Sequence, residues 1–172
     1  MRISTIIASC VLLVTPPALA RTVEPGSFSV GGGIGPSIRL GSTLDAGRAY
    51  FLLRGQGEYA FTSQLSAVAD LSLGIGSAVP LRLHLGGRYR FTNLDLPVSP
   101  YAQLQLSLGR LYNVLGANLG YVGARAGGGA DYFLTKNLGV GGLLALDLGS
   151  TTGARPAFFG VVDIALYATY TF

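Results

Sequence analysis

The sequence predicts an all-β fold: an eight-stranded antiparallel up-and-down transmembrane β-barrel. Hydrophobic residues make up 49% of the chain and charged residues only 12%, about half the charged share of roughly 25% in soluble domains. After residue 20, no segment holds the roughly 18–20 unbroken apolar residues that a membrane-spanning helix needs. Instead, apolar and polar residues alternate in eight successive segments. Because the backbone crosses hydrocarbon only as a helix or a closed barrel, the alternation favours a barrel.

Residues 1–20 are predicted to be a cleaved signal peptide. Arg2 supplies a positive start, Ile6–Val14 is a short apolar core, and Ala18–Ala20 forms a small-x-small cleavage signal. We therefore expect the barrel domain to span residues 21–172. The formal net charge of +4 is a mild bias and predicts no nucleic-acid partner.

Cys10 offers an alternative, because the residues before it resemble a lipoprotein cleavage box. The apolar region continues past Cys10, and few residues precede it. The sequence therefore favours cleavage after Ala20, which leaves a mature chain without cysteine.

The first four segments, read with the two-residue period of a strand, place apolar side chains on one face. Residues 27–40 set Phe, Val, Ile and Leu against Ser, Gly and Arg, and residues 51–61 set aromatic residues, Leu and Gly against Arg, Gln and Glu. Residues 65–75 set Leu and Ala against Ser, Asp and Gly. Residues 81–91 give the clearest pattern, with leucines and aromatic residues opposite Arg and His.

The last four segments continue the alternation. Residues 102–112 set mainly Leu against Gln and Ser, and residues 121–134 set Val, Ala and Tyr against Gly, Arg and Asp. Residues 138–149 and 158–172 each carry one inward Asp among small or apolar residues. Segment length and even number match a small transmembrane barrel. A soluble β-sandwich also alternates, but its strands are usually shorter and its charged face meets water.

The connections predict the orientation, because an exported chain with an even strand count has both termini in the periplasm. Tight periplasmic turns are then expected at residues 62–63 and 135–137, with a longer turn at 92–99. The predicted outside loops are residues 41–48, 77–80, 113–119 and 150–157. They are short for this class, and none is large enough to build an adhesive head.

Aromatic residues support this orientation. Those predicted to face lipid at the periplasmic ends are Phe28, Tyr59, Phe61, Tyr89, Phe91, Tyr132, Tyr170 and Phe172. Such rings form interfacial girdles in transmembrane barrels. A thinner outer girdle is predicted from Phe51, Tyr112 and Phe158.

The chain ends in Tyr170-Thr171-Phe172, which resembles the C-terminal signal of outer-membrane barrels. With eight predicted strands, the mature chain resembles the OmpA-like and OmpX-like barrels. This resemblance implies an outer-membrane location, contact with membrane lipid and lipopolysaccharide, and recognition of Tyr170 and Phe172 by the barrel-assembly machinery.

The inward face predicts a charged lumen, meaning the barrel interior. Its predicted members are Arg39, Arg54, Glu58, Asp70, Arg82, His84, Arg88, Arg90, Arg125, Asp131, Asp147 and Asp163. Because unpaired buried charges are costly, this near-balance favours a polar plug over an ion path. If Leu134 and Leu138 oppose each other, Arg125 lies opposite Asp147, which predicts a cross-strand ion pair. Asp70 is predicted to reach Arg88 diagonally.

Arg110 departs from the pattern, because its parity points it outward near Tyr112. A lipid-facing cation is tolerated near the interface but costs ~2–4 kcal/mol at the midplane. Two readings stay open: Arg110 binds a phosphate of the outer-leaflet glycolipid, or it only extends to the interface.

The sequence predicts no enzyme, cofactor or metal site. The runs at residues 31–35 and 127–129 are rich in Gly but lack the strand–loop–helix context of a phosphate-binding loop. His84 has no His or Cys partner for a metal, and a triad with Ser72 and Asp70 would point into the lumen. We expect a non-enzymatic envelope protein with a structural or surface-interaction role. The alternatives are a small channel for ions or solutes and a module that presents loops or a strand edge to a partner.

Overall fold

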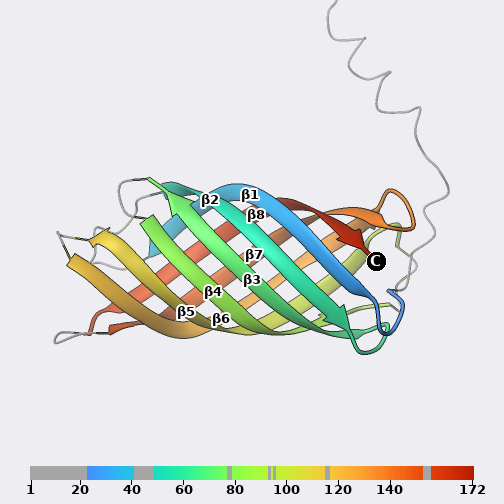
Figure 1. Cartoon of the computed structure of the whole chain (residues 1–172), viewed down its shortest axis with the longest axis horizontal. Coiled ribbons are helices and arrows are strands. Elements are labelled where there is room, and N and C mark those ends of the chain that lie inside the picture. The colour runs from blue at the N-terminus through green and yellow to red at the C-terminus, as the bar shows by residue number, and fades with distance from the viewer. Residues whose placement is uncertain are drawn as a thin grey trace, which may run out of the picture.

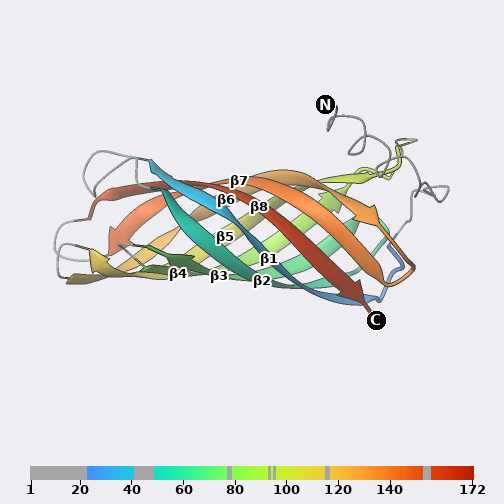
Figure 2. The same cartoon turned by 90° about the horizontal axis from the view of Figure 1, so that it is seen from above.

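Eight antiparallel strands close in chain order into one barrel (Figures 1 and 2). The structure is a computed structural model and describes residues 23–40, 49–76, 79–92, 94, 96–114, 117–152 and 156–172. The strands are β1 (Phe28–Leu40), β2 (Ala49–Ala60), β3 (Leu65–Ile75), β4 (Val79–Arg90), β5 (Ser99–Val114), β6 (Ala117–Phe133), β7 (Leu138–Thr152) and β8 (Phe158–Thr171). The predicted fold class is confirmed. The predicted signal peptide and its cleavage site lie outside the described residues.

Both termini of the described chain and the two tight turns lie at the same end of the barrel. The C-terminus lies there, at the right of Figure 1, beside the β2–β3 and β6–β7 connections. The Phe172 N–H donates to the Phe28 carbonyl (2.9 Å), and the Thr171 N–H donates to the Asn137 carbonyl (2.8 Å). We call this end the terminal rim and the opposite end the loop rim.

The two tight turns of the terminal rim share one construction. In the β2–β3 turn, the Thr62 hydroxyl accepts a hydrogen bond from the Leu65 N–H (2.9 Å). In the β6–β7 turn, Thr135 does the same for the Leu138 N–H (3.0 Å). In both turns a threonine hydroxyl therefore takes the place of a backbone acceptor. Both turns lie where the sequence predicted them.

Three of the four loop-rim connections are shorter than predicted. β5 continues to Val114 and β6 begins at Ala117, so most of the predicted 113–119 loop is strand. Val114 pairs with Ala117 across a register irregularity that follows Leu111. β4 likewise begins at Val79, and β7 continues to Thr152. Continued cross-strand pairing, which local sequence does not reveal, extends these strands.

The barrel closes where β1 pairs with β8. Partners run from Ser29 to Ile34 on β1 and resume at Ser37. Pro36, which has no backbone N–H to donate, lies in this interruption and pairs with Phe51 on the β2 side. The closing seam is therefore continuous at both ends and interrupted in between.

Lumen-facing glycines allow the strands to approach closely. A Cβ added at Gly35 would lie 1.9 Å from the Ile164 carbonyl oxygen, and one at Gly86 would lie 2.0 Å from the Leu104 carbonyl oxygen. The Gly-rich runs at residues 31–35 and 127–129 lie within β1 and β6. They are packing positions rather than a phosphate-binding loop.

The outward face of each strand is predominantly apolar. Burial alternates residue by residue, most regularly in β2 and β3. Large exposed side chains such as Leu104, Leu106 and Leu166 cover the exterior. No helix long and apolar enough to cross a membrane occurs among the described residues.

Candidate functional site

All twelve predicted lumen residues point inward and are buried. They come from every strand of the barrel except β5. The structure divides most of them into two groups that follow each other along the barrel axis.

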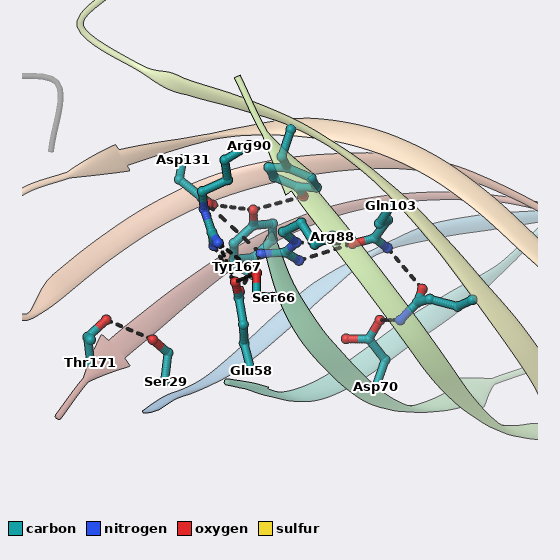
Figure 3. Close-up of polar contacts among 12 residues, drawn as sticks. Ser29, Glu58, Ser66, Asp70, Arg88, Arg90, Gln103, Asp131, Tyr167 and Thr171 are labelled. Atoms are coloured by element: carbon teal, nitrogen blue, oxygen red, sulfur yellow. Dashed lines mark hydrogen bonds and ion pairs between the residues drawn. The ribbon is translucent and has the colours of Figure 1, made fainter. Parts of the chain in front are cut away.

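The rim cluster lies near the terminal rim and consists of Glu58, Arg88, Arg90 and Asp131 (Figure 3). Arg88 donates to the Glu58 carboxylate (2.8 Å), and Arg90 holds both oxygens of that carboxylate. Arg90 also reaches Asp131 (3.4 Å). Ser66 donates a further hydrogen bond to Glu58 (2.5 Å). Two cations and two anions therefore neutralise each other.

Two tyrosines pack around the rim cluster. The Arg88 guanidinium lies 4.1 Å from the centroid of the Tyr101 ring, within the range of a cation–π contact. The Tyr167 hydroxyl contacts the Tyr101 hydroxyl (2.8 Å) and the Asp131 carboxylate. Neither tyrosine was predicted as a site residue. The alternation of the eighth segment placed Tyr167 on the inward face, whereas Tyr101 directly precedes the fifth predicted segment.

The central cluster consists of Arg54, Asp70, Arg82, Arg125, Asp147 and Asp163. Arg54 and the Gln105 amide each donate to the Asp70 carboxylate at 2.6 Å. Arg125 contacts the same carboxylate at 3.5 Å. The Gln103 amide donates to Gln105 (3.0 Å) and joins the two clusters, as the chain of dashed lines in Figure 3 shows.

Arg82 is the bridge of the central cluster. It donates to Asp147 (3.0 Å) and to Asp163 (2.9 Å), which lie on β7 and β8. Arg125 donates to the other oxygen of Asp163 (3.0 Å), and the Tyr121 hydroxyl lies 2.5 Å from Asp147. Three cations face three anions, so this cluster is also neutral.

Two predicted ion pairs are wrong. Arg125 and Asp147 are opposite in the register, but Arg125 binds Asp163 and Asp70 while Asp147 binds Arg82. Arg88 binds Glu58, not Asp70. The reason is reach: in a narrow barrel an Arg side chain crosses the lumen to a strand that is not its neighbour.

His84 lies within the central cluster. Its Nδ1 lies 3.4 Å from Arg125 Nη1, and its Nε2 lies 3.1 Å from Asp147. Because guanidinium only donates, this network assigns Nδ1 as an acceptor and Nε2–H as the donor to Asp147. Ser72, His84 and Asp70 do not form a catalytic triad. The Ser72 hydroxyl donates to the Arg82 carbonyl (3.5 Å), and the Asp70 carboxylate accepts from Arg54. No cluster of metal-ligating side chains occurs in the described parts of the chain.

An apolar layer lies in the loop-rim half of the lumen. It consists of six buried side chains: Tyr50, Leu52, Leu111, Tyr121, Phe159 and Val161. The Tyr121 and Phe159 rings lie 4.8 Å apart, edge to face, and the Arg39 guanidinium lies 5.5 Å from the Phe159 centroid. The alternation predicted that Leu52, Phe159 and Val161 point inward. That they lie together in one layer depends on the register between strands, which the alternation does not give.

The predicted assembly signal sits at the closing seam. The Phe172 ring lies 5.1 Å from the Tyr170 ring and 6.4 Å from the Phe28 ring. Together with the Phe172–Phe28 backbone bond, these contacts join the last residue of the chain to the first residue of β1.

Arg110 points outward and is exposed, as predicted. Its guanidinium lies 5.9 Å from the Tyr112 ring centroid. Among the charged residues of the eight described strands, it alone faces away from the lumen.

No protein-family model matches the sequence, and no curated protein sequence is significantly similar to it. Solved structures are similar. Neisserial surface protein A (NspA) matches 86% of this chain with 97% of its own, at 15% identity and a TM-score of 0.71. The N-terminal β-barrel domain of Pseudomonas aeruginosa OprF matches 86% with 98% of its own (15% identity, TM-score 0.61). Ail, the attachment invasion locus protein of Yersinia pestis, matches 86% with 99% of its own (14% identity, TM-score 0.60). At these identities the likeness concerns the fold: this chain has the closed eight-stranded barrel of small outer-membrane β-barrel proteins.

Proposed function

We propose that this protein is a non-enzymatic integral outer-membrane protein that contributes to envelope integrity or surface interactions, with a lumen closed by its own side chains. One observation carries the proposal. The molecule is apolar outside and charged inside, with six arginines and five carboxylates buried within the barrel. Water would favour the reverse arrangement, and hydrocarbon favours this one.

The apolar band has the height of a membrane. On β5, Ala102 lies beside Tyr89 of the aromatic girdle, and Arg110 is eight residues further along. Eight residues span ~27 Å of strand, or ~20 Å of height at a tilt of ~40°. This height is close to the apolar band of ~25 Å in transmembrane barrels. Arg110 would then lie at the membrane interface, where its guanidinium can bind a phosphate of the outer-leaflet glycolipid.

Export and orientation complete the proposal. Residues 1–20 would be removed as a signal peptide, and the barrel domain would span residues 21–172. The terminal rim would face the periplasm, where Tyr170 and Phe172 serve as the signal for the barrel-assembly machinery.

Cell fractionation combined with heat-dependent gel mobility tests this proposal. We expect the protein in the outer-membrane fraction, migrating differently before and after boiling because a closed barrel stays folded in detergent. A water-soluble protein without a mobility shift would refute it.

A small channel is the second candidate. The favouring observation is Gln56, which is buried in the lumen while neither of its amide atoms has a hydrogen-bond partner in the described structure. Such a group indicates hydration of that part of the lumen. Steady conductance steps of the purified protein in planar bilayers would favour the channel over the plug.

A further inference from the structure

The inward side chains change in character along the barrel axis. Read from the terminal rim along β2, they are Ala60, Glu58, Gln56, Arg54, Leu52 and Tyr50. The three that follow Ala60 are polar, and the last two belong to the apolar layer. The order is the same on β8, where Tyr167 and Asp163 precede Val161 and Phe159.

Access to the lumen also changes along this axis. Inward-facing Ser29, Gly33 and Thr169 near the terminal rim are partly exposed. Gln56 and Arg54 are 7% and 5% exposed, whereas Leu52 is fully buried. Leu111, Phe159 and Val161 of the apolar layer are fully buried as well, and so are Asp70, Arg82 and Arg125 of the central cluster. Tyr50, the next inward residue of β2 after Leu52, is 8% exposed.

Several buried polar atoms on the terminal-rim side of the apolar layer have no hydrogen-bond partner in the described structure. Besides both amide atoms of Gln56, they include Arg54 Nη1 and Arg125 Nε. A buried polar atom without a partner costs about 1–3 kcal/mol, and buried water usually satisfies such atoms. Water from the terminal rim can hydrate these atoms, whereas Leu52, Leu111, Phe159 and Val161 offer water no side-chain hydrogen bond. The layer carries two hydroxyls: that of Tyr121 is bonded to Asp147, and that of Tyr50 has no partner in the described structure.

We propose that the lumen is a hydrated inlet open to the terminal rim and that the apolar layer is its gate, a barrier to water and small ions. Apolar constrictions block ions because they exclude water. The charged clusters occupy the inlet, but their polar atoms can be hydrated. The inference rests on the closed lumen of the proposed function and assigns that closure to particular residues.

Two double variants test the gate in planar bilayers. Leu52→Asn with Val161→Thr makes the layer polar at nearly constant volume, and Leu52→Ala with Phe159→Ala removes volume. We expect resolvable conductance steps from both and none from the unaltered protein. The matched control is Leu143→Asn, which alters a buried apolar lumen residue that packs with Tyr101 and Tyr167 outside the layer; it should stay silent.

The gate is refuted if the double variants retain the heat-dependent mobility shift of a closed barrel and are as silent as the unaltered protein. Conductance by the unaltered protein would instead refute the closed lumen of the proposed function. The two failures are therefore distinguishable.

Cysteine labelling tests the inlet without removing the layer. Cys10 is the only cysteine of the chain, so a cysteine introduced after it is unique once the predicted signal peptide is removed. In protein inserted into lipid vesicles, Gln56→Cys should react with a small charged thiol reagent, and Val161→Cys should be protected. Equal reactivity at the two positions, or the reverse order, overturns the proposal.

Discussion

Asp163 is the carboxylate that joins two arginines of the central cluster. It accepts hydrogen bonds from Arg82 (2.9 Å), Arg125 (3.0 Å) and Ser37. Its replacement leaves both guanidinium groups with one fewer anion in a fully buried site. Removal of one member of a buried ion pair is far more costly than loss of an exposed one.

We therefore expect Asp163→Asn to lower the free energy of unfolding by about 3–5 kcal/mol. The temperature at which the gel-mobility shift occurs should fall accordingly. Glu24→Gln, at an exposed position of the terminal rim, is the control and should leave it unchanged. Equal transition temperatures for the two variants would show that the cluster does not stabilise the barrel.

Double-mutant cycles distinguish the observed pairing from the pairing that the register alone predicts. Arg82 and Asp147 should show a coupling energy above about 1 kcal/mol, because they are bonded. Arg125 and Asp147, which are opposite but meet only through His84, should show a smaller coupling energy. Denaturant unfolding of the refolded barrels measures both couplings, and a larger coupling for Arg125 and Asp147 would contradict the structure.

The sequence predicted which residues are buried in the lumen but not which of them pair. Alternation requires only the two-residue period, so the inward placement of Arg125 and Asp147 follows directly, and a hairpin turn adds their register. Partners across the lumen depend on the curvature of the whole sheet. The bond from Arg82 on β4 to Asp163 on β8 therefore has no local signature.

Among the elements, β1 depends on glycine where it meets β8. A side chain at Gly35 would collide with the backbone of Ile164, and backbone cannot move aside without breaking the closing seam. Gly55, on the outer face of β2, has no atom within 4 Å of an added Cβ. These two glycines form a matched pair.

We expect Gly35→Ala to reduce strongly the yield of closed barrel on refolding and Gly55→Ala to leave it close to that of the unaltered protein. The fraction that shows the heat-dependent mobility shift measures the yield. Similar yields for the two variants would mean that β1 and β8 tolerate a wider separation.

At the end of β8, two variants distinguish a packing role of Phe172 from its predicted role in recognition by the assembly machinery. Phe172→Ala and Phe91→Ala each remove an exposed aromatic ring of the terminal rim that contacts a nearby tyrosine. If Phe172 is part of the assembly signal, Phe172→Ala should lower the amount of protein in the outer membrane of cells, whereas Phe91→Ala should not. Refolding in vitro should be similar for both. Equal amounts in cells would remove Phe172 from the signal.

Strand positions were predictable because each strand carries its own alternation. The loop-rim ends of β5, β6 and β7 were not, since Asn113 and Ser150 look like turn residues but lie within β5 and β7. The Thr62 and Thr135 turns were predictable because their chemistry is local.

For the molecule as a whole, the two rims predict a fixed orientation in the membrane. The proposal places residues 41–48 outside and the exposed Lys136 turn in the periplasm. An impermeant thiol reagent should therefore label Thr43→Cys on intact cells and label Lys136→Cys after permeabilisation of the outer membrane. Labelling of Lys136→Cys on intact cells would reverse the orientation.

At this scale the sequence predicted the inside and outside of the barrel but not the division of its interior. Leu52, Leu111 and Phe159 lie far apart in sequence and meet because the registers of several strand pairs act together. Each inward apolar residue looked like an exception to a polar face. Only the closed sheet shows that these apolar residues lie at a similar height along the barrel axis.

The cross-lumen bonds also constrain how the polypeptide enters the bilayer. Arg82 on β4 is neutralised by residues of β7 and β8, and Arg90 on β4 by residues of β2 and β6. Stepwise insertion of single hairpins would carry these guanidinium groups into hydrocarbon before their counter-charges arrive, at a cost of several kcal/mol for each uncompensated ion. A concerted route, in which the sheet curls while it inserts, avoids that cost.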